Sequence, residues 1–559
     1  MYSELHSAMI DTKLLSQANL LMKRKEFAAA EKIYLELLSK NPNNDIVQAF
    51  LGRLYIYKRK YKGAERILEK AYNRRKTAPT VAALAFCKFK IQKYDEAVIL
   101  YEELFRYDPD NIKIFEKIIQ AFAELKMYNF ANAYALKLYS KYPDKEISNV
   151  MLTQSYIDIG EFKKAEESCA KTIQMFPKSG AAWIIAGTLQ EFSECNEELA
   201  QECYITAIEC GAPSAYYHLA VSYQKVGKYK EAEENYKKMM ELLPHQKTPL
   251  ASLGTLYLTQ KDVENGYKYF QNRELPPEIA NIKKEKWNGQ VYSDETLMLY
   301  FDQGIGDCIQ FVRYLPFIVD KFKTIKIVIR ESCYDLFKHN YPKEKYPNIE
   351  FYKDVLSLGE YDKYTLSTDL PYYLKIDFNH IPFSGGYLVC DENKKNYFKE
   401  KYFNTDKLKV GLCWRAGGFG LRSAIHRTIN IEYLKKLFEL KKVQFYSFQL
   451  DDIFDAVQKY PQMIDLKPDI KTFDDTAGAM ANVDIMVSVD TSCIHLAGAM
   501  GIKSLLLIPY CSDWRWFEDN KSTEWYDSVE IIKQEERVHW FIEAEKLYNK
   551  LKEYSENGL

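Results

Sequence analysis

The sequence carries almost no net charge and lacks the cysteine spacings of a zinc site or a disulfide framework. Over 559 residues, 77 lysines and arginines balance 78 aspartates and glutamates, so bulk charge favours neither nucleic acid nor a membrane surface as a partner. The 11 cysteines include no Cys-x-x-Cys pair. An odd, unpatterned set of cysteines is typical of reduced thiols, and we expect neither a bound metal nor disulfide bonds.

Long apolar runs are also missing. No run approaches the roughly 18–20 residues that a membrane-spanning helix needs. The segment from Met1 to Leu15 mixes Glu4, Asp11 and Lys13 with apolar residues, so it lacks the apolar core of a signal peptide. Together with the cysteine pattern and the balanced charge, these absences predict a cytoplasmic protein with no membrane span and no nucleic-acid partner. The length of 559 residues predicts two or three domains.

A repeat with a period of 33 or 34 residues runs through the first half of the chain. In five places an aromatic residue, here called a marker residue, is followed three positions later by an alanine and fifteen positions later by a proline. Tyr61 with Ala64 continues the pattern as a further marker, and Val263 with Gly266 gives a weaker last copy. The marker–proline pairs are Phe27/Pro42, Tyr94/Pro109, Tyr128/Pro143, Phe162/Pro177 and Tyr229/Pro244.

The small residues and prolines of this repeat have packing roles. Gly52, Ala220 and Gly254 lie nine positions before a marker residue, where paired helices approach closely. The proline ends the second helix because it cannot continue the hydrogen-bond ladder. A helix–turn–helix unit of this period resembles the tetratricopeptide repeat, whose arrays stack into solenoids that commonly bind another polypeptide along their concave surface. We expect an α-solenoid of about eight units over residues 1–275, with either an inserted turn or a local bend at 191–198.

From residue 295 onward the pattern changes to short apolar runs separated by helical stretches. Such alternation is typical of parallel sheets. Two series of runs predict α/β structure with two doubly wound lobes, over residues 295–395 and 405–535. A linker at 276–294 and a C-terminal helix at 536–559 complete the predicted order. The runs lie at residues 296–301, 325–329, 409–414, 443–448, 484–489 and 504–508.

Polar residues follow four of these predicted strands, and ligands of parallel sheets bind at that end of the strands. Gln303-Gly304-Ile305-Gly306-Asp307 comes after the first run. The glycines allow close approach of the backbone, and the next helix offers the unpaired N–H groups of its first turn. Asp307 either caps that helix or acts as a catalytic base, and the residues leave both interpretations open.

The loop that follows residue 414 is basic and contains glycine. Its cations are Arg415, Arg422 and Arg427, with His426 beside the last. Cations after a strand end suit a phosphate or another anion. A solvated basic loop is the simpler interpretation of this segment by itself.

The run at 484–489 is followed directly by a polar turn. Thr491 and Ser492 can cap the helix that begins there, and the N–H groups of its first turn can hold a diphosphate next to Asp490. His495 lies in the first turn of the same helix, where it faces either a ligand or the core. A packing histidine is the ordinary interpretation of such a residue.

A tryptophan-flanked arginine follows the last run. Arg515 stands between Trp514 and Trp516, directly after Asp513. Stacking on the rings could aim its guanidinium at an anion. A packing cluster between domains explains the same residues.

In this order, the segments resemble the heptosyltransferase-like branch of the GT-B glycosyltransferases, in members fused to tetratricopeptide repeats. Gly304–Asp307 is similar to the first-strand loop of that family, and Asp490, Thr491 and His495 are similar to its nucleotide-sugar loop. Repeat-fused members also carry the stretch found here at Asp513–Trp516. The architecture is similar to that of the eukaryotic O-linked N-acetylglucosamine transferase.

The resemblance implies transfer of a sugar from a nucleotide-activated donor to a hydroxyl group, with no metal ion and no cofactor. Asp307 would be the general base. Arg427, Arg515 and the helix that follows Asp490 would neutralise the departing nucleoside diphosphate, and His495 would contact the diphosphate or the sugar. The remaining residues implied to bind the donor are Gly304, Gly306, Arg415, Thr491 and Ser492.

Three functions stay open from the sequence. The acceptor is a protein held by the repeats, or it is a lipid-linked or polysaccharide molecule, or the chain is an inactive scaffold that binds partners through its repeats. The first lobe is short for a GT-B enzyme, so we expect the last repeats to pack against it in place of missing elements.

Overall fold

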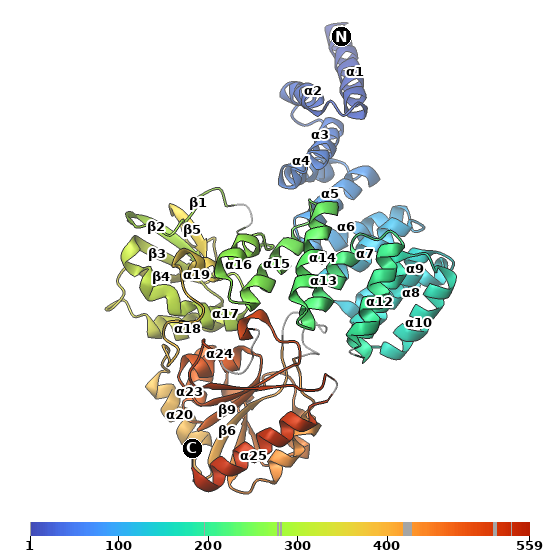
Figure 1. Ribbon diagram of the computed structural model, residues 1–559. Helices are drawn as coiled ribbons and strands as arrows, with labels where there is room; N and C mark the ends of the chain where they lie inside the picture. The colour runs from blue at the N-terminus through green and yellow to red at the C-terminus, as the bar shows by residue number, and fades with distance from the viewer. Residues whose placement is uncertain are drawn as a thin grey trace. The chain divides into compact units, whose positions relative to one another are not determined.

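The computed structural model describes residues 2–194, 196–276, 279, 282–417, 427–517, 523–537 and 539–558. Helices occupy the N-terminal half, and helices alternate with parallel strands in the C-terminal half (Figure 1). The chain forms two compact units, Met1–Ile185 and Ala186–Leu559. The boundary falls inside α11 (Gly180–Leu189), so the second unit contains the last repeats together with both sheets.

The first unit consists of helices joined by short turns. They are α1 (Tyr2–Lys23), α2 (Phe27–Lys40), α3 (Asp45–Tyr57), α4 (Tyr61–Arg74), α5 (Ala78–Lys90), α6 (Tyr94–Tyr107), α7 (Ile112–Glu124), α8 (Tyr128–Lys141), α9 (Glu146–Asp158) and α10 (Phe162–Met175). Every marker residue of this unit is the first residue of a helix, from Phe27 in α2 to Phe162 in α10. The alanine three residues later is buried in each copy. The repeat predicted from the sequence is therefore present as a helical array.

Close helix packing explains the small residue at position 52. A Cβ atom added to Gly52 would lie 2.5 Å from Cγ of Leu68, so a side chain there would push α3 away from α4. A side-chain cap starts several of the first helices of the pairs, as in α3, where the Asn44 side chain accepts from the N–H of Val47. The first unit thus follows from short-range features of the sequence.

The irregular junction predicted at 191–198 contains an inserted turn. One turn of π-helix, Gln190–Glu194, follows α11, and this geometry adds a residue to the turn. α12 (Glu197–Glu209) begins after its cap, Asn196. The other repeat helices of the second unit are α13 (Ala215–Lys225), α14 (Tyr229–Leu242), α15 (Thr248–Thr259) and α16 (Val263–Phe270).

The first sheet has the strand order β1-β5-β2-β3-β4, and its strands pair in parallel. Its strands are β1 (Glu285–Lys286), β2 (Tyr292–Tyr300), β3 (Phe322–Val328), β4 (Ile349–Tyr352) and β5 (Lys363–Leu366), and its helices are α17 (Ile305–Phe311), α18 (Glu331–Asn340) and α19 (Leu370–Tyr373). β1 and the start of β2 lie within residues 276–294, which we had predicted to be a linker. A two-residue strand carries no periodic signal, so the sequence could not reveal it.

The last repeat packs into the core of the first sheet, as we expected from the short length of that lobe. Leu258, Tyr267 and Phe270 belong to the same buried cluster as Leu297 and Leu299 of β2. Figure 1 shows α16 beside α19. The last repeat and the first sheet therefore share one hydrophobic core.

The second sheet has the order β11-β10-β9-β6-β7-β8 and is also parallel. Its strands are β6 (Leu408–Cys413), β7 (Val443–Ser447), β8 (Met463–Asp465), β9 (Ile485–Val489), β10 (Ser504–Ile508) and β11 (Val529–Lys533), and its helices are α20 (Glu392–Tyr402), α22 (Phe454–Lys459), α23 (Phe473–Met480), α24 (Ser492–Ala499) and α25 (Phe541–Asn557). β9 and β10 are buried along their whole length. This confirms α/β structure in the C-terminal half.

One boundary differs from the sequence prediction. α20 spans the predicted end of the first lobe at residue 395, yet it packs against α23 of the second lobe. Lys394 forms ion pairs with Asp474 at 2.9 Å and with Asp475 at 2.7 Å. The helix is polar and has no long apolar stripe, so the sequence did not show which sheet it covers.

Candidate functional site

The strand order of the second sheet creates a topological switch point. β6 has β7 on one side and β9 on the other, so the chain proceeds in opposite directions from β6. Ligands of such sheets bind outside the carboxyl ends of the strands at this point. Arg415 lies two residues beyond β6, and Asp490 follows β9 directly. The sulfur of Cys413 lies 3.7 Å from Oγ1 of Thr491, so the two predicted loops begin side by side.

Thr491 starts α24, as one of the two caps that we predicted. Its Oγ1 accepts a hydrogen bond from the N–H of Cys493 at 3.3 Å and lies 3.0 Å from Oγ of Ser488. Ser492 is the first residue of the helix. The cap fixes the start of α24 next to the carboxyl end of β9, and the unpaired N–H groups of a helix's first turn suit an anion.

His495 is a buried residue that is held by aromatic neighbours. Its Nδ1 lies 3.0 Å from the hydroxyl of Tyr526, and its ring stacks on Trp516 with 5.3 Å between centroids. Burial, with help from Arg515, lowers the pKa of His495 to about 3, so the imidazole is neutral near pH 7. These contacts match the packing interpretation, although Nε2 also lies 3.9 Å from a carboxylate oxygen of Asp490.

The close approach of His495 explains the glycine at position 306. A Cβ atom on Gly306 would lie 2.7 Å from Cδ2 of His495. Gly306 belongs to α17 and His495 to α24, and the two helices are neighbours (Figure 1). The glycine therefore lets a helix of the first sheet meet a helix of the second.

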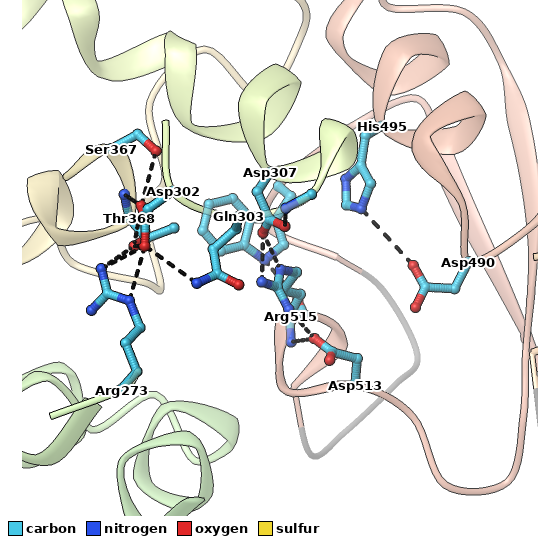
Figure 2. A network of polar contacts seen from close by, with 12 residues as sticks. Arg273, Asp302, Gln303, Asp307, Ser367, Thr368, Asp490, His495, Asp513 and Arg515 are labelled. Carbon is cyan, nitrogen blue, oxygen red and sulfur yellow. Dashed lines mark hydrogen bonds and ion pairs between the residues drawn. The ribbon is translucent and has the colours of Figure 1, made fainter. Parts of the chain in front are cut away.

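Asp307 has the capping role, which is one of the two roles that the sequence left open, and an ion pair in addition. Its Oδ2 accepts a hydrogen bond from the N–H of Gly304 at 3.1 Å, which occupies that backbone donor. Its Oδ1 accepts from Nε of Arg515 at 2.8 Å and lies 2.5 Å from Nη2 (Figure 2). The side chain of Arg515 is 14% exposed and also contacts Asp513 at 2.7 Å. One guanidinium thus joins the first loop to the last.

Acidic side chains outnumber cations in this cluster, which we define as Asp307, Asp490, Asp513, Arg427 and Arg515. Burial raises the pKa of Asp307 above its ordinary value, against the opposing effect of Arg515. Burial and the neighbouring Asp513 raise the pKa of Asp490 to about 6, and Arg427 opposes the shift. Carboxylates with shifted pKa values suit proton exchange, and the two arginines of the cluster suit an anion.

The two described arginines of the basic loop lie in different places. Arg427 lies 3.6 Å from a carboxylate oxygen of Asp490 and donates to the Asp490 carbonyl at 3.3 Å. Arg415 instead forms an ion pair with Asp451 at 3.0 Å, and its backbone N–H donates to Gln449. The structure therefore brings Arg427 into the cluster and pairs Arg415 outside it. Arg422 and His426 lie outside the described residues.

A cavity of about 850 Å³ extends between the repeats of the second unit and the carboxyl ends of β10 and β11. Arg427 and Asp513 lie in its wall and connect it to the charged cluster. The repeat side contributes hydroxyl and amide groups of α13 and α15, including Gln224, Ser252 and Thr255. Its aromatic lining residues are Tyr217, Tyr229, Tyr236, Tyr433, Tyr510, Phe517 and Trp540.

The first sheet has its own switch point, between β2 and β5. Asp302 lies two residues beyond β2, and Asp369 lies three residues beyond β5. The guanidinium of Arg273, which follows α16, reaches both: Nη2 lies 2.8 Å from Asp302 (Figure 2), and Nη1 lies 2.9 Å from Asp369. Lys286 approaches Asp369 at 2.7 Å. The chain therefore places its own cation where a ligand of a parallel sheet would bind.

We did not predict this second network from the sequence. Asp302 was within reach of prediction, because it precedes Gln303-Gly304 and stands just after an apolar strand, where functional groups of parallel sheets occur. Arg273 carried no such signal. It lies 29 residues from Asp302 and 96 from Asp369 along the chain, and no local pattern links the three.

Within the described ranges, no group of three or more histidine, cysteine, aspartate or glutamate side chains is placed to hold a metal ion. None of the helices described is both long and apolar enough to cross a membrane.

Comparison with known proteins identifies the repeats. A family model described as "Tetratricopeptide repeat" matches residues 213–246, which span α13 and α14. A crystal structure of a tetratricopeptide repeat protein from Parabacteroides merdae has a TM-score of 0.39 and 13% identity, and covers 44% of this chain and 97% of that chain.

Two curated proteins are similar to this chain in sequence. Protein FlbA of Caulobacter vibrioides is 24% identical over 319 residues, or 51% of this chain and 52% of FlbA. The anaphase-promoting complex subunit cut9 of Schizosaccharomyces pombe is 21% identical over 249 residues, or 43% of this chain and 37% of cut9. The matches thus span about half of FlbA and little more than a third of cut9. The helical half of the chain contains tetratricopeptide repeats, and the C-terminal half contains two parallel sheets.

Proposed function

We propose that the protein is a metal-independent glycosyltransferase of the GT-B type, which moves a sugar from a nucleotide-activated donor to a hydroxyl group of a protein held by the repeats. One observation carries the proposal. Asp307 of α17, just beyond the first sheet, binds the guanidinium of Arg515, which lies in the segment that follows β10 of the second sheet. Facing loops from the carboxyl ends of two sheets are what a donor and an acceptor need in order to react.

The cluster supplies the groups that such a transfer requires. Asp307 accepts the proton of the acceptor hydroxyl. At the same time the hydroxyl oxygen of the acceptor bonds to the anomeric carbon of the sugar, and the bond between that carbon and the nucleoside diphosphate breaks. The raised pKa of Asp307 favours this proton transfer. Arg515 and Arg427 neutralise the diphosphate, with the first turn of α24 beside them. Loss of one such donor costs about 3–4 kcal/mol in the transition state.

Binding of the donor would exchange the partners of Arg515. Its guanidinium now contacts the carboxylates of Asp307 and Asp513. Diphosphate oxygens match the same donor fork, so a bound donor competes for Arg515 and leaves an oxygen of Asp307 free to act as a base.

The cavity beside the cluster supports a polypeptide acceptor. Its wall combines aromatic rings with the hydroxyl and amide groups of α13 and α15, which pair well with an extended peptide. These helices belong to the repeat array, and such arrays bind polypeptides along their inner helices. Arg427 and Asp513 lie at the wall that adjoins the cluster.

An inactive scaffold is the second candidate, and one observation favours it. Both carboxylate oxygens of Asp307 already have partners, one from Gly304 and one from Arg515. In a scaffold, Asp307 would join the two sheets and do nothing else, while the repeats bind a protein partner.

Thermal unfolding with a panel of nucleoside diphosphates and nucleotide sugars separates the two candidates. A ligand at 100 times its dissociation constant adds about 2.7 kcal/mol to the free energy of unfolding. We expect at least one nucleotide to stabilise the wild type, and Arg427→Met to weaken that effect. Arg415→Met is the matched control, since Arg415 pairs with Asp451 outside the cluster. No stabilisation by any nucleotide would favour the scaffold.

Turnover then tests the base. With a donor identified, Asp307→Asn keeps the size of the side chain and removes its basic oxygen. We expect product formation to fall by roughly 100-fold or more, which is the usual contribution of general base catalysis. Unchanged turnover in Asp307→Asn would reject the role of Asp307.

A further inference from the structure

The switch point of the first sheet is a built site for one guanidinium group. All five N–H donors of Arg273 have acceptors. Nε and one N–H of Nη2 bind Asp302 at 2.9 and 2.8 Å, and the second N–H of Nη2 binds Oγ1 of Thr368 at 2.6 Å. Nη1 binds Asp369 at 2.9 Å and the Phe270 carbonyl at 3.3 Å. No donor of the fork is left over.

The site is closed to water. The side chains of Asp302 and Asp369 are fully buried, and that of Arg273 is 6% exposed. The guanidinium carbon lies 4.5 Å from the ring centroid of Phe270, so the flat face of the group stacks on the last repeat. A buried charge is tolerated only when it is paired and hydrogen-bonded on all sides, and this crevice meets that condition for a guanidinium.

Arg273 holds one end of the loop that carries Asp307. Asp302 accepts from Arg273 and also from Nε2 of Gln303 at 3.2 Å (Figure 2). The Gln303 carbonyl accepts from Arg330 at 3.0 Å. Asp307 holds the other end of the loop through Gly304 and Arg515, as described above. The loop is therefore fixed at Asp302 by the repeats and at Asp307 by the second sheet.

We infer that Arg273 is a positioning residue: its guanidinium is the resident ligand of the first switch point, and it sets the loop from Asp302 to Asp307 relative to the last repeat. An acceptor held by the repeats of the second unit is thereby kept in a constant position relative to Asp307. This last consequence rests on the proposed function, while the binding of a guanidinium in the crevice does not.

Chemical rescue of Arg273→Ala tests the inference without any substrate. The probe is guanidinium chloride at low millimolar concentration, with sodium chloride at the same ionic strength as its control. Hydrogen–deuterium exchange is read at the amides of residues 302–307. We expect at least about tenfold faster exchange in Arg273→Ala than in the wild type, and recovery of protection with guanidinium only. Nucleotide binding in the same variant reports separately on the proposed function.

Two further variants keep the test decisive. Lys286→Met removes the other cation at Asp369 and does not touch Asp302, so the loop should keep wild-type protection. If Arg273→Ala does not fold, Arg273→Lys is measured instead, because a lysine keeps the charge and lacks the planar fork. In Arg273→Lys we expect the amides to exchange faster than in the wild type and more slowly than in an unprotected loop. Wild-type protection in Arg273→Lys, or in Arg273→Ala without guanidinium, would overturn the inference, as would an exposed loop that guanidinium does not protect.

Discussion

The two parallel sheets of the second unit use their switch points in opposite ways. At the first, Arg273 fills the crevice between β2 and β5 and pairs with Asp302 and Asp369. At the second, Arg427 pairs with Asp490 near the end of β9 and also lies in the wall of a large cavity. A crevice that already holds an arginine of the chain cannot take another ligand. We therefore propose the second sheet, and not the first, as the place where a nucleotide binds, while the first switch point contacts the residue that follows the last repeat.

This difference shows that equivalent positions in similar sheets need not have equivalent roles. What separates them is burial: the side chain of Asp302 is fully buried, while that of Arg427 is 28% exposed. A fully buried ion pair is costly to break, because either partner alone is left as an unpaired charge. A partly exposed pair exchanges one partner for another at little cost.

The largest effect should come from breaking the first switch point. We expect Arg273→Met to lower the free energy of unfolding of the second unit by about 3–5 kcal/mol, because it leaves buried carboxylates without their cation. Arg427→Met should cost about 1 kcal/mol or less. Urea unfolding followed by tryptophan fluorescence reports on this unit, since Trp183 alone of the 7 tryptophans lies outside it. Equal losses in the two variants would remove the contrast between the sheets.

The contact between the two sheets is tested at Gly306. Gly306→Ala places a methyl group 2.7 Å from the buried ring of His495, and we expect a loss of about 1–3 kcal/mol in the free energy of unfolding. Gly417→Ala is the matched control, because nothing lies within 4 Å of the added atom. In a His495→Ala background the cost of Gly306→Ala should nearly vanish. A full cost in that background would show that the histidine is not what excludes a side chain.

The pH dependence of stability in acid distinguishes the contribution of His495 from that of Asp490. His495 has its pKa lowered to about 3, so its contribution to stability is complete above its ordinary pKa of 6.5 and is lost as the pH falls below it. Asp490 has its pKa raised to about 6, so its contribution is largest at low pH and is lost as the pH rises through 6.

Unfolding free energies between pH 4 and 6 should therefore move in opposite directions in two variants, by up to about 1.4 kcal/mol per pH unit for each proton. His495→Gln should weaken the loss of stability in acid, and Asp490→Asn should strengthen it. The same pH profile in both variants would contradict these assignments.

The smallest effect should come from Lys286. Its side chain is 27% exposed and it reaches Asp369 from outside the crevice. We expect Lys286→Met to cost about 1 kcal/mol or less in urea unfolding. A cost as large as that of Arg273→Met would mean that the first switch point depends on charge alone and not on the guanidinium fork.

Local features of the fold were predictable, and long-range ones were not. The strand Ser504–Ile508 has the predicted bounds, and the marker residues begin their helices, because apolar runs and helix starts depend on neighbours in the chain. The sequence also revealed the cap at Thr491 and left the cap at Asp307 as one of two roles. It did not reveal that Arg415 pairs outside the cluster, because its partner Asp451 is 36 positions away.

By itself, the sequence determined where the repeats lie, where six of the strands lie and which loops carry polar residues, since period, capping and turn chemistry act over a few residues. Only the tertiary structure decided that Arg515 meets Asp307, 208 residues away, and that Arg273 closes the first switch point. The physical reason is that such pairs depend on strand order and on helix packing. Both are set by how whole apolar faces are buried together, and not by any local pattern.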